Sequence, residues 1–310
     1  MNKFKLYPDC KLVRGISRAA IYDFTRNDIF LVPKNIADLF VDEQINLDDV
    51  KDVDIKELKE FLIDNELGRF NLTDELIHIS EEIISAGAIT NAIIDVDNNT
   101  NHLNKVACEL SDLLCESVSL RFAEDVPIEN ILSSCNLFTD ISISNLEICI
   151  THSDNIDELI ECILSNISIC SRIIVMNSPT ECTKYKANDI VVRYVKAKMQ
   201  YNLCCDSELN FSQYANASLT FYNESRKFNN CLYKKVYIDN SGNISNCPML
   251  NKVFGNISDN TISSVIELNS FKVLWFITKD DINKCSDCEL RYACHNCIFL
   301  NHKCTYNVYE

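Results

Sequence analysis

Seven cysteines crowd into residues 231 to 310 of this 310-residue chain, which carries 17 in all. Two C-x-x-C pairs stand only five residues apart, the first at Cys285 and Cys288 and the second at Cys294 and Cys297. The two halves of a zinc ribbon are separated by about 15 to 20 residues, so this spacing favours a more compact cage. A cubane iron–sulfur cluster takes four thiolates from tight loops, which dense C-x-x-C runs supply. The full set is Cys231, Cys247, Cys285, Cys288, Cys294, Cys297 and Cys304.

The cellular compartment decides how such cysteines are interpreted. The N-terminal residues MNKFKLYPDC include lysines but no apolar segment behind them, and no run of about 18 apolar residues occurs. We therefore expect a cytoplasmic protein without a membrane span. In a reducing cytosol, closely spaced cysteines are interpreted as metal or cluster ligands before they are interpreted as disulfides.

Charge and glycine content exclude several functions. Asp+Glu 45 against Lys+Arg 29 leaves a net charge of −16, which repels nucleic acid and anionic membranes. The chain has only 5 glycines, and they are too scattered to form a P-loop or a G-x-G-x-x-G loop. We therefore expect no nucleic-acid partner, no membrane partner and no ATP bound by this chain.

The first part of the chain, residues 1 to 80, has the pattern of a small α+β unit. β-type runs at Lys11–Val13, Ala19–Phe24 and Ile29–Val32 are separated by polar turns. Apolar residues then recur at helical spacing in residues 36–40 and 55–62, which predicts two amphipathic helices.

From residue 81 to 225, strand and helix patterns alternate. Strands are predicted at residues 89–96, 117–122, 146–150, 172–176 and 189–195, and helices at 103–115, 128–135 and 156–167. This alternation predicts parallel strands with helical crossovers. About four such steps are too few for an eight-fold barrel, so we expect an α/β fold with an open or partial sheet.

Nine cysteines in and just after the predicted sheet show no ligand spacing. We interpret them as small hydrophobic residues of the core, because buried cysteine behaves in this way. They are Cys108, Cys115, Cys135, Cys149, Cys162, Cys170, Cys182, Cys204 and Cys205.

A β-hairpin is predicted between the first two cysteines of the C-terminal set. The residues Asn240–Asn243 form a turn signal between the β-type run Val236–Ile238 and Ile244. Such a hairpin would bring Cys231 and Cys247 together.

The order of the seven cysteines resembles the SPASM domain, the auxiliary-cluster domain at the C-terminus of many radical S-adenosylmethionine enzymes that modify peptides. Cys231 is followed by ten residues, a glycine, four residues and Cys247, and after a gap by Cys-x2-Cys-x5-Cys and two more cysteines. One spacing departs from the family, because two residues rather than three separate Cys294 from Cys297. The resemblance implies a loop-rich, cysteine-rich SPASM domain over residues 226 to 310.

The resemblance also implies two ligand sets. One [4Fe-4S] cluster would be held by Cys285, Cys288, Cys294 and Cys304, and a second site would be held by Cys231, Cys247 and Cys297. Family members with both clusters usually supply a further cysteine just before the first, where this chain has Glu224–Lys227. The second site would thus be open, completed by another ligand, or empty. His295 or His302 could complete a Cys3His site, which zinc would accept, so we expect one or two clusters with zinc as the alternative.

The motif that radical S-adenosylmethionine enzymes need is absent. That chemistry requires C-x3-C-x2-C, and no two cysteines of this chain are four residues apart. We therefore expect no bound S-adenosylmethionine, and the central sheet resembles a degenerate, partial radical-SAM-like β/α unit. The combination resembles the SPASM-domain protein of grasp-with-spasm systems, which accompanies an ATP-grasp ligase and a short precursor peptide during maturation of a ribosomally synthesised peptide (RiPP).

The N-terminal unit resembles the small winged, PqqD-like element that binds a leader peptide by adding it as an extra strand beside a helix. Main-chain hydrogen bonds give such binding its affinity, and apolar pockets give it register. An ordinary capping subdomain is the alternative. The residues expected to bind the peptide are Tyr22, Phe24, Ile29, Leu31, Leu58 and Leu62.

Two kinds of function fit these patterns. In the first, an iron–sulfur partner protein recognises a precursor peptide and works with a separate ATP-grasp ligase. In the second, the open cluster site performs redox or Lewis-acid chemistry on the peptide, or the cysteines hold zinc in a structural adaptor. The sequence leaves open whether the protein is an enzyme.

Overall fold

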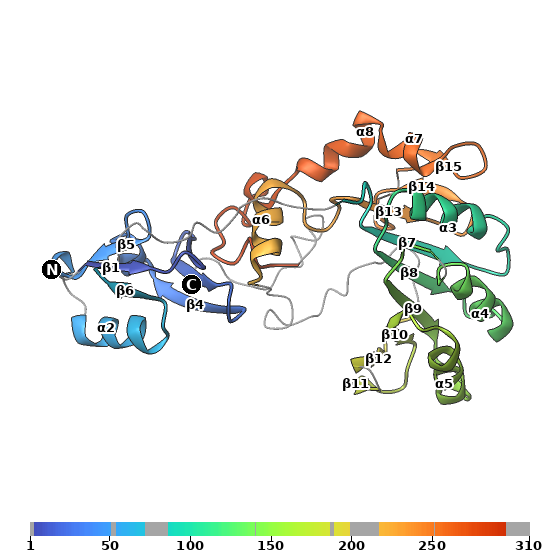
Figure 1. Cartoon of the computed structure of the whole chain (residues 1–310), viewed down its shortest axis with the longest axis horizontal. Coiled ribbons are helices and arrows are strands. Elements are labelled where there is room, and N and C mark those ends of the chain that lie inside the picture. The colour runs from blue at the N-terminus through green and yellow to red at the C-terminus, as the bar shows by residue number, and fades with distance from the viewer. Residues whose placement is uncertain are drawn as a thin grey trace. The chain divides into compact units, whose positions relative to one another are not determined.

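The computed structural model describes residues 3–50, 54–71, 86–139, 141–186, 189–198, 217–250 and 252–295. The chain forms two compact units, whose elements are labelled in Figure 1. Unit 1 comprises Met1–Ile84, Cys205–Cys231 and Phe276–Glu310, and unit 2 comprises Ser85–Cys204 and Leu232–Trp275. Each unit is assembled from segments that are distant in the sequence: the hairpin after Cys231 pairs with the central sheet, and residues 288–293 pack on the N-terminal strands.

Two three-stranded antiparallel sheets form the N-terminal part of unit 1. Their strand orders are β2-β3-β4 and β5-β1-β6. The three expected strands are confirmed as β2, β3 and β4, whereas β1, β5 and β6 were not expected, because strands of three or four residues leave little alternation in the sequence. The strands are β1 Lys3–Leu6, β2 Cys10–Arg14, β3 Arg18–Asp23, β4 Asp28–Pro33, β5 Gln44–Asn46 and β6 Gly68–Phe70.

The helices of this part differ in length. The second expected helix is confirmed as α2 (Ile55–Asp64), which begins where the Asp54 carboxylate accepts the N–H of Lys56 at 2.8 Å. The first is only one turn long, as α1 (Lys34–Ala37), and a 3-10 turn, η1 (Leu47–Asp49), follows β5.

Strand β3 is the centre of unit 1, and both of its faces are buried. On one face Ile21 packs into a core that includes Leu62 of α2. On the other face Tyr22 packs into a second core with Leu290 and Ala293. We call residues 285–294 the cysteine segment. The small sheet therefore separates helix α2 from the cysteine segment.

The remaining elements of unit 1 are short. They are α6 (Leu219–Lys227) and the 3-10 turn η5 (Lys279–Asp281). Phe276, the last residue of η4 (Val273–Phe276), also belongs to this unit.

A nine-stranded sheet builds unit 2, in the order β11-β12-β10-β9-β8-β7-β13-β14-β15. Its parallel strands β7, β8, β9, β10 and β12 confirm the five expected strands, and α3, α4 and α5 confirm the three expected helices. The strands are β7 Asn91–Val96, β8 Ser117–Phe122, β9 Asn145–Thr151, β10 Cys170–Met176, β11 Cys182–Tyr185, β12 Val191–Tyr194, β13 Lys235–Ile238, β14 Asn243–Ser245 and β15 Gly255–Asn256. The helices are α3 Leu103–Asp112, α4 Ile128–Asn136, α5 Ile156–Asn166, α7 Ile262–Ile266 and α8 Asn269–Lys272.

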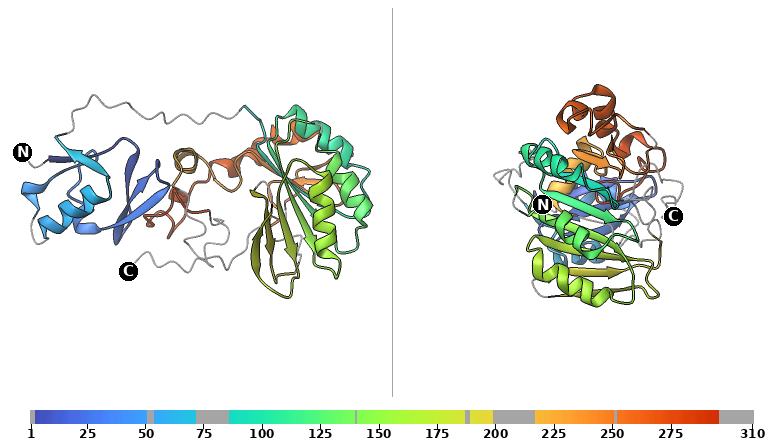
Figure 2. Two further views of the ribbon diagram at one scale, coloured as in Figure 1. Left: turned by 60° about the horizontal axis from the view of Figure 1, so that its bottom comes forward. Right: turned by 90° about the vertical axis from the view of Figure 1, so that its right-hand side faces the viewer.

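Helices α3, α4 and α5 cover one face of this sheet, as Figure 2 shows. Strands β7 to β10 are neighbours in chain order, so right-handed crossovers place every connecting helix on the same face. The covered face is apolar, with Ile94, Leu120 and Ile148 fully buried. The opposite face carries Asp95 and Arg121 at paired positions of β7 and β8.

The hairpin predicted after Cys231 is confirmed as β13 and β14. At its turn Gly242 has a φ of +80°, a left-handed conformation that favours glycine, and Asp239 Oδ1 accepts the Asn243 N–H at 2.9 Å. The parallel pairing of β13 with β7 was not expected, and it extends the sheet by one hairpin. Within the described ranges, no helix combines the length and apolar character that crossing a membrane requires.

Candidate functional site

The cysteine segment is a run of tight turns. The Cys288 N–H donates to the Cys285 carbonyl at 3.0 Å, and the next turn is closed by Arg291 N–H on the Cys288 carbonyl at 3.3 Å. Lys284, just before the first cysteine, has a φ of 70°, which reverses the chain direction there. Cys285 and Cys288 thus flank a single turn, the conformation in which a C-x-x-C pair can bind one metal centre.

Two of the predicted ligand sulfurs accept backbone hydrogen bonds. The Leu290 N–H lies 3.4 Å from Cys288 Sγ, and the Met249 N–H lies 3.4 Å from Cys247 Sγ. In both cases the donor is two residues after the cysteine. Such donors stabilise a sulfur that carries negative charge, and they tune the potential of an iron–sulfur cluster.

The small N-terminal sheet holds the cysteine segment in place. Tyr22 Oη donates to the Glu289 carbonyl at 2.8 Å, and Arg18 Nε pairs with the buried Glu289 carboxylate at 2.5 Å. A Cβ at Gly15 would lie 2.8 Å from the Glu289 nitrogen, so glycine permits this close approach of two backbones. The segment and the sheet therefore fold as one piece.

The other side of the segment contacts α6 and the loop after it. Asn230 Nδ2 donates to the Cys294 carbonyl at 2.8 Å, and Lys279 Nζ donates to the same oxygen. The His295 ring stacks on Phe221 with 4.1 Å between ring centres. The backbone at Cys294 is thereby fixed from two directions.

The full ligand sets extend beyond the described residues. Cys297, Cys304 and His302 lie outside them, and each predicted cluster set includes one of these two cysteines. Cys231 belongs to unit 1 and Cys247 to unit 2. Within the described ranges, no three His, Cys, Asp or Glu side chains converge closely enough to hold a metal ion. Cysteine sulfurs on tight turns that accept backbone N–H groups are the kind of ligand that a [4Fe-4S] cluster takes, so the cluster stays a prediction from the sequence.

The remaining cysteines divide into buried and exposed groups. Burial raises the pKa of the Cys115 and Cys149 thiols to about 12 and that of Cys170 to about 11, and it raises the pKa of Cys135 further. These four confirm the interpretation as core residues. The interpretation is wrong for the others that the structure describes, because Cys108 and Cys182 are exposed and Cys162 is half-buried. Cys204 and Cys205 lie outside the described residues.

Alkylation should separate these two groups of thiols. In native protein treated with iodoacetamide at pH 8, we expect Cys108 and Cys182 to react within minutes and Cys115 and Cys149 to stay protected. A thiol with a pKa of about 12 is about one part in 10⁴ thiolate at that pH, and the thiolate is the nucleophile. Peptide mapping by mass spectrometry measures the four sites in one digest. Equal labelling of all four would contradict the burial.

The outer edge of β4 is the candidate peptide site. Phe24 is hydrogen-bonded to Asp9, and Gly15 to Arg18, so every second residue of β3 bonds to β2. The residues of β3 between them, Ala19 and Ile21, therefore bond to β4. Their partners on β4 are Val32 and Phe30. The N–H and C=O groups of Ile29 and Leu31 then point away from the sheet. The Ile29 N–H indeed donates to the Asp28 carboxylate, at 2.8 Å.

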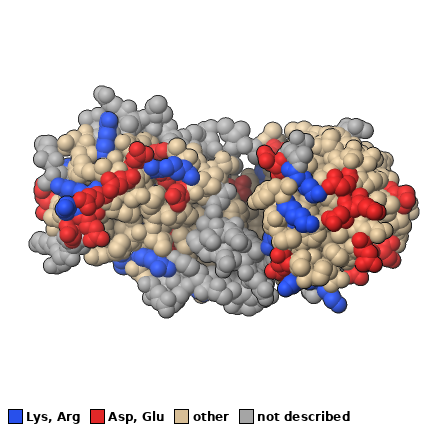
Figure 3. Space-filling model, turned by 90° about the horizontal axis from the view of Figure 1, so that it is seen from below, with Lys and Arg blue, Asp and Glu red and all other residues tan. Residues whose placement is uncertain are grey.

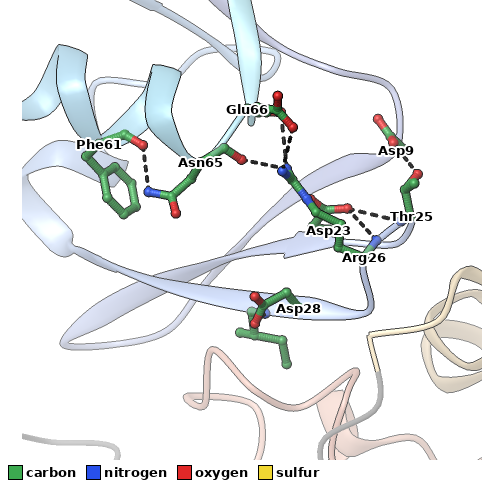
Figure 4. A network of polar contacts seen from close by, with 9 residues as sticks. Asp9, Asp23, Thr25, Arg26, Asp28, Phe61, Asn65 and Glu66 are labelled. Atoms are coloured by element: carbon green, nitrogen blue, oxygen red, sulfur yellow. Dashed lines mark hydrogen bonds and ion pairs between the residues drawn. The ribbon is translucent and has the colours of Figure 1, made fainter.

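Helix α2 stands beside this edge, and a polar network fixes its position. Figure 4 shows Arg26, in the turn between β3 and β4, reaching the C-terminal end of α2. Its guanidinium donates to the carbonyls of Asn65 at 2.5 Å and Glu66 at 3.2 Å and pairs with Asp23 at 2.5 Å. Phe30 of β4 contacts Phe61 of α2 edge to face, with 6.2 Å between ring centres. Helix α2 therefore packs against β4 through Phe30 and Phe61.

The residues predicted to bind the peptide lie at different depths. Leu31 is 48% exposed and Ile29 is half-buried, both on β4. Phe24 packs on Tyr222, and Tyr22, Leu58 and Leu62 are buried in the two cores. The buried residues support the sheet and helix, and Ile29 and Leu31 supply the accessible edge.

A buried polar network on the sheet of unit 2 was not expected from the sequence. Arg121 Nε pairs with Asp95 Oδ1 at 2.6 Å, and Tyr237 Oη donates to Asp95 Oδ2 at 2.5 Å. Burial raises the pKa of the Asp95 carboxyl, and the hydrogen bonds from Arg121 and Tyr237 offset part of that rise. The signal was present in the strands, because SVSLRF alternates polar with apolar residues and NAIIDV places Asp95 between two apolar neighbours.

Loss of the arginine should destabilise unit 2. We expect Arg121→Met to cost about 3–5 kcal/mol of unfolding free energy, because it leaves the Asp95 charge buried without its cation. Trp275, the single tryptophan, is buried in unit 2 and reports its unfolding by fluorescence in urea. The matched control is Arg172→Met, whose side chain is 55% exposed and whose ion pair with Glu147 should contribute little. Equal midpoints for the two variants would contradict the expectation.

Comparisons with known proteins give little further information. No protein-family model matches the chain, and no curated protein matches it. Two solved structures align with it, the crystal structure of Streptococcus suis SuiB and that of SuiB bound to precursor peptide SuiA. Each alignment covers 96% of this chain and 96% of the other at 13% sequence identity and a TM-score of 0.34. Values this low do not establish a shared fold.

Proposed function

We propose that this chain is an iron–sulfur SPASM-type protein that binds a precursor peptide and takes part in its maturation together with an ATP-grasp ligase. Cys285, Cys288, Cys294 and Cys304 would hold a [4Fe-4S] cluster, and Cys231, Cys247 and Cys297 would hold a second centre. The cluster would supply a rigid cross-link for the cysteine segment and a redox-active group close to the small sheet.

One observation carries this proposal: the cysteine segment shares a buried core with the β2-β3-β4 sheet. Tyr22 joins them, since its ring packs among Leu290 and Ala293 and its hydroxyl bonds to the Glu289 carbonyl. A protein that used its cysteines only for a structural metal site would not require an open strand edge in the same unit. A peptide-binding unit that needed no metal would not require this set of cysteines.

The β4 edge supplies the peptide-binding half of the proposal. A peptide added along β4 would take main-chain hydrogen bonds from Ile29 and Leu31. Its side chains would alternate between the α2 side, lined by Phe30 and Phe61, and the opposite side, where Ile29 packs on the core shared with the cysteine segment. Alternate side chains of the peptide would thus contact the α2 side, and the others would point toward the face that bears the cysteine segment.

Metal content tests the first half of the proposal. Protein purified without oxygen should be brown and contain iron and acid-labile sulfide, and an iron count of about four or eight per chain separates one cluster from two. Colourless protein with stoichiometric zinc under those conditions would favour the zinc-binding adaptor instead.

Reconstitution tests the second half. The ligase and the precursor, identified from neighbouring genes, are incubated with ATP in the presence and absence of this protein. We expect the same product mass in both, formed faster when the protein is present. A product mass that changes only with this protein would favour the enzyme alternative, and an unchanged rate as well as an unchanged mass would eliminate both.

A further inference from the structure

The Asp28 side chain occupies a main-chain donor at the open edge of β4. Its Oδ1 atom accepts the Ile29 N–H at 2.8 Å, and both residues belong to the strand itself. Hydrogen bonds alternate along β3 and β4, so this N–H points away from the sheet and is one of the groups that an added peptide strand would use. In the free protein, the carboxylate therefore takes the place that a peptide carbonyl would take.

This contact makes Asp28 a competitor of the peptide. When a peptide carbonyl accepts the Ile29 N–H, the hydrogen bond to Asp28 must break, so the number of bonds at this donor does not change. The bond that is lost involves an ionised acceptor, and such bonds are stronger than those between neutral groups. An uncharged peptide therefore gains less at Ile29 than at Leu31, the other residue whose main chain points outward.

The displaced carboxylate has no cationic partner within the described ranges. Asp28 is exposed, and its printed contact is the one with the Ile29 N–H, which carries no charge. Arg26, two residues before it, is already engaged, because its guanidinium donates to Asp23 and to the carbonyls of Asn65 and Glu66. A cation that neutralises Asp28 would thus come from the ligand.

The surroundings of Asp28 add to its negative charge. Asp9, Asp23 and Asp28 all lie near the turn between β3 and β4, as Figure 4 shows, and Asp9 accepts the hydroxyl of Thr25 at 2.5 Å. The whole chain has a net charge of −16, and acidic side chains form patches on the face shown in Figure 3. A basic side chain beside Asp28 is therefore attracted, and an acidic one is repelled.

The position of Asp28 on the strand also suits a long basic side chain. Asp28 and Phe30 are two residues apart on β4, so they lie on the same face, where Phe30 packs on Phe61 of α2. Lysine and arginine place their aliphatic stems on apolar surface while the charged group reaches a polar one. The stem would lie over Phe30, and the charge would reach Asp28.

Building on the proposed binding of the precursor at β4, we propose that Asp28 blocks this edge until a peptide with a basic side chain displaces it. Asp28 is then the residue that selects lysine or arginine in the bound segment. The contact protects the open edge in the free protein, as charged side chains at edge strands commonly do.

Three matched peptides test the selection. N-acetylated, C-amidated hexapeptides of alternating Lys and Val, Gln and Val, or Glu and Val are titrated calorimetrically into the full-length protein. We expect the Lys peptide to bind about three- to fivefold more tightly than the Gln peptide, which is the effect of one exposed ion pair, and the Glu peptide to bind most weakly. Salt at about 0.5 M should remove most of this difference, because it screens the charges.

Two substitutions of Asp28 separate its charge from its blocking effect. Asp28→Asn keeps an oxygen that accepts the Ile29 N–H but has no charge, so it should bind the Lys and Gln peptides nearly equally. Asp28→Ala also removes the acceptor and should bind the Gln peptide about fivefold more tightly than the unmodified protein does, since no bond to the side chain must break. A variant that was merely destabilised would not gain affinity.

A matched control is Asp154→Asn, the same change at an exposed aspartate of unit 2, which should leave the preference for the Lys peptide unchanged. Circular dichroism shows whether each variant is folded. A preference for the Lys peptide that persists in Asp28→Asn, or an unchanged Kd of the Gln peptide in Asp28→Ala, would overturn the selection by Asp28. Absence of binding by all three peptides at millimolar concentration would overturn it as well.

Ile29→Pro distinguishes a failure of this inference from a failure of the proposed function. The variant should lose binding of the precursor and of all three hexapeptides. If it does so while both Asp28 variants bind like the unmodified protein, β4 is the peptide site and the selection by Asp28 is wrong. Normal binding of precursor and hexapeptides by folded Ile29→Pro would overturn both.

Discussion

Replacing Cys285 or Cys288 with alanine is expected to remove most of the iron and to unfold the cysteine segment. A loop-rich segment of this kind has little core of its own, so ligation energy is folding energy. The loss should extend into the small sheet, because Tyr22 and Arg18 both take their partners from Glu289, one residue after Cys288. Loss of a metal can lower the unfolding free energy by more than about 4 kcal/mol. At about 2–4 °C of unfolding temperature per kcal/mol, the unfolding temperature of unit 1 should fall by roughly 10 °C.

The measurement combines iron analysis with calorimetry of anaerobically purified protein. The matched control is Cys182→Ala, which removes an exposed thiol of unit 2 and should change neither the iron content nor the transition. Full iron content in both Cys285→Ala and Cys288→Ala would show that the cluster is held elsewhere in the chain. Loss of iron with an unchanged transition would show that the segment folds without it.

Replacing Ile29 with proline is expected to abolish binding of the precursor peptide while the protein remains folded. The Ile29 N–H points away from β3 and bonds only to the Asp28 side chain among the contacts seen at this edge, so its removal leaves the β3–β4 ladder intact. Proline removes the donor that an added strand would use and blocks the approach of that strand. For a peptide bound in the micromolar range, about 8 kcal/mol of binding free energy is at stake.

Fluorescence anisotropy of the labelled precursor measures this effect on the full chain. Ile29→Val keeps the donor and should bind normally. Tyr22→Pro is the contrasting variant, because Tyr22 lies in the central strand and its backbone bonds to β2, so that change should unfold unit 1 rather than merely block binding. Normal binding by folded Ile29→Pro would move peptide recognition away from β4.

The spacing of apolar residues along the sequence was enough to predict most of the large sheet. Strands β7 to β10 and helices α3 to α5 each carry a full period of apolar residues, so local pattern and tertiary packing agree. The same strands also contained the alternation of Asp95 and Arg121 with apolar neighbours, which indicates a sheet face without helices. Interpreting these strands only as apolar segments missed the buried Asp95–Arg121–Tyr237 network.

The sequence by itself determined the alternating strands and helices of unit 2, the β13–β14 hairpin, the spacing of the cysteines and the absence of the C-x3-C-x2-C motif. These features depend on neighbours within about ten residues, where pattern and turn chemistry are strong. Only the tertiary structure decided that the cysteine segment packs on β3 through Tyr22 and that β13 joins the central sheet beside β7. Each of these contacts joins residues more than 140 positions apart, as the pairing of Tyr22 with Glu289 at a separation of 267 shows. No local period encodes which distant surfaces meet, because that choice depends on the total apolar area and hydrogen bonding of the assembled fold.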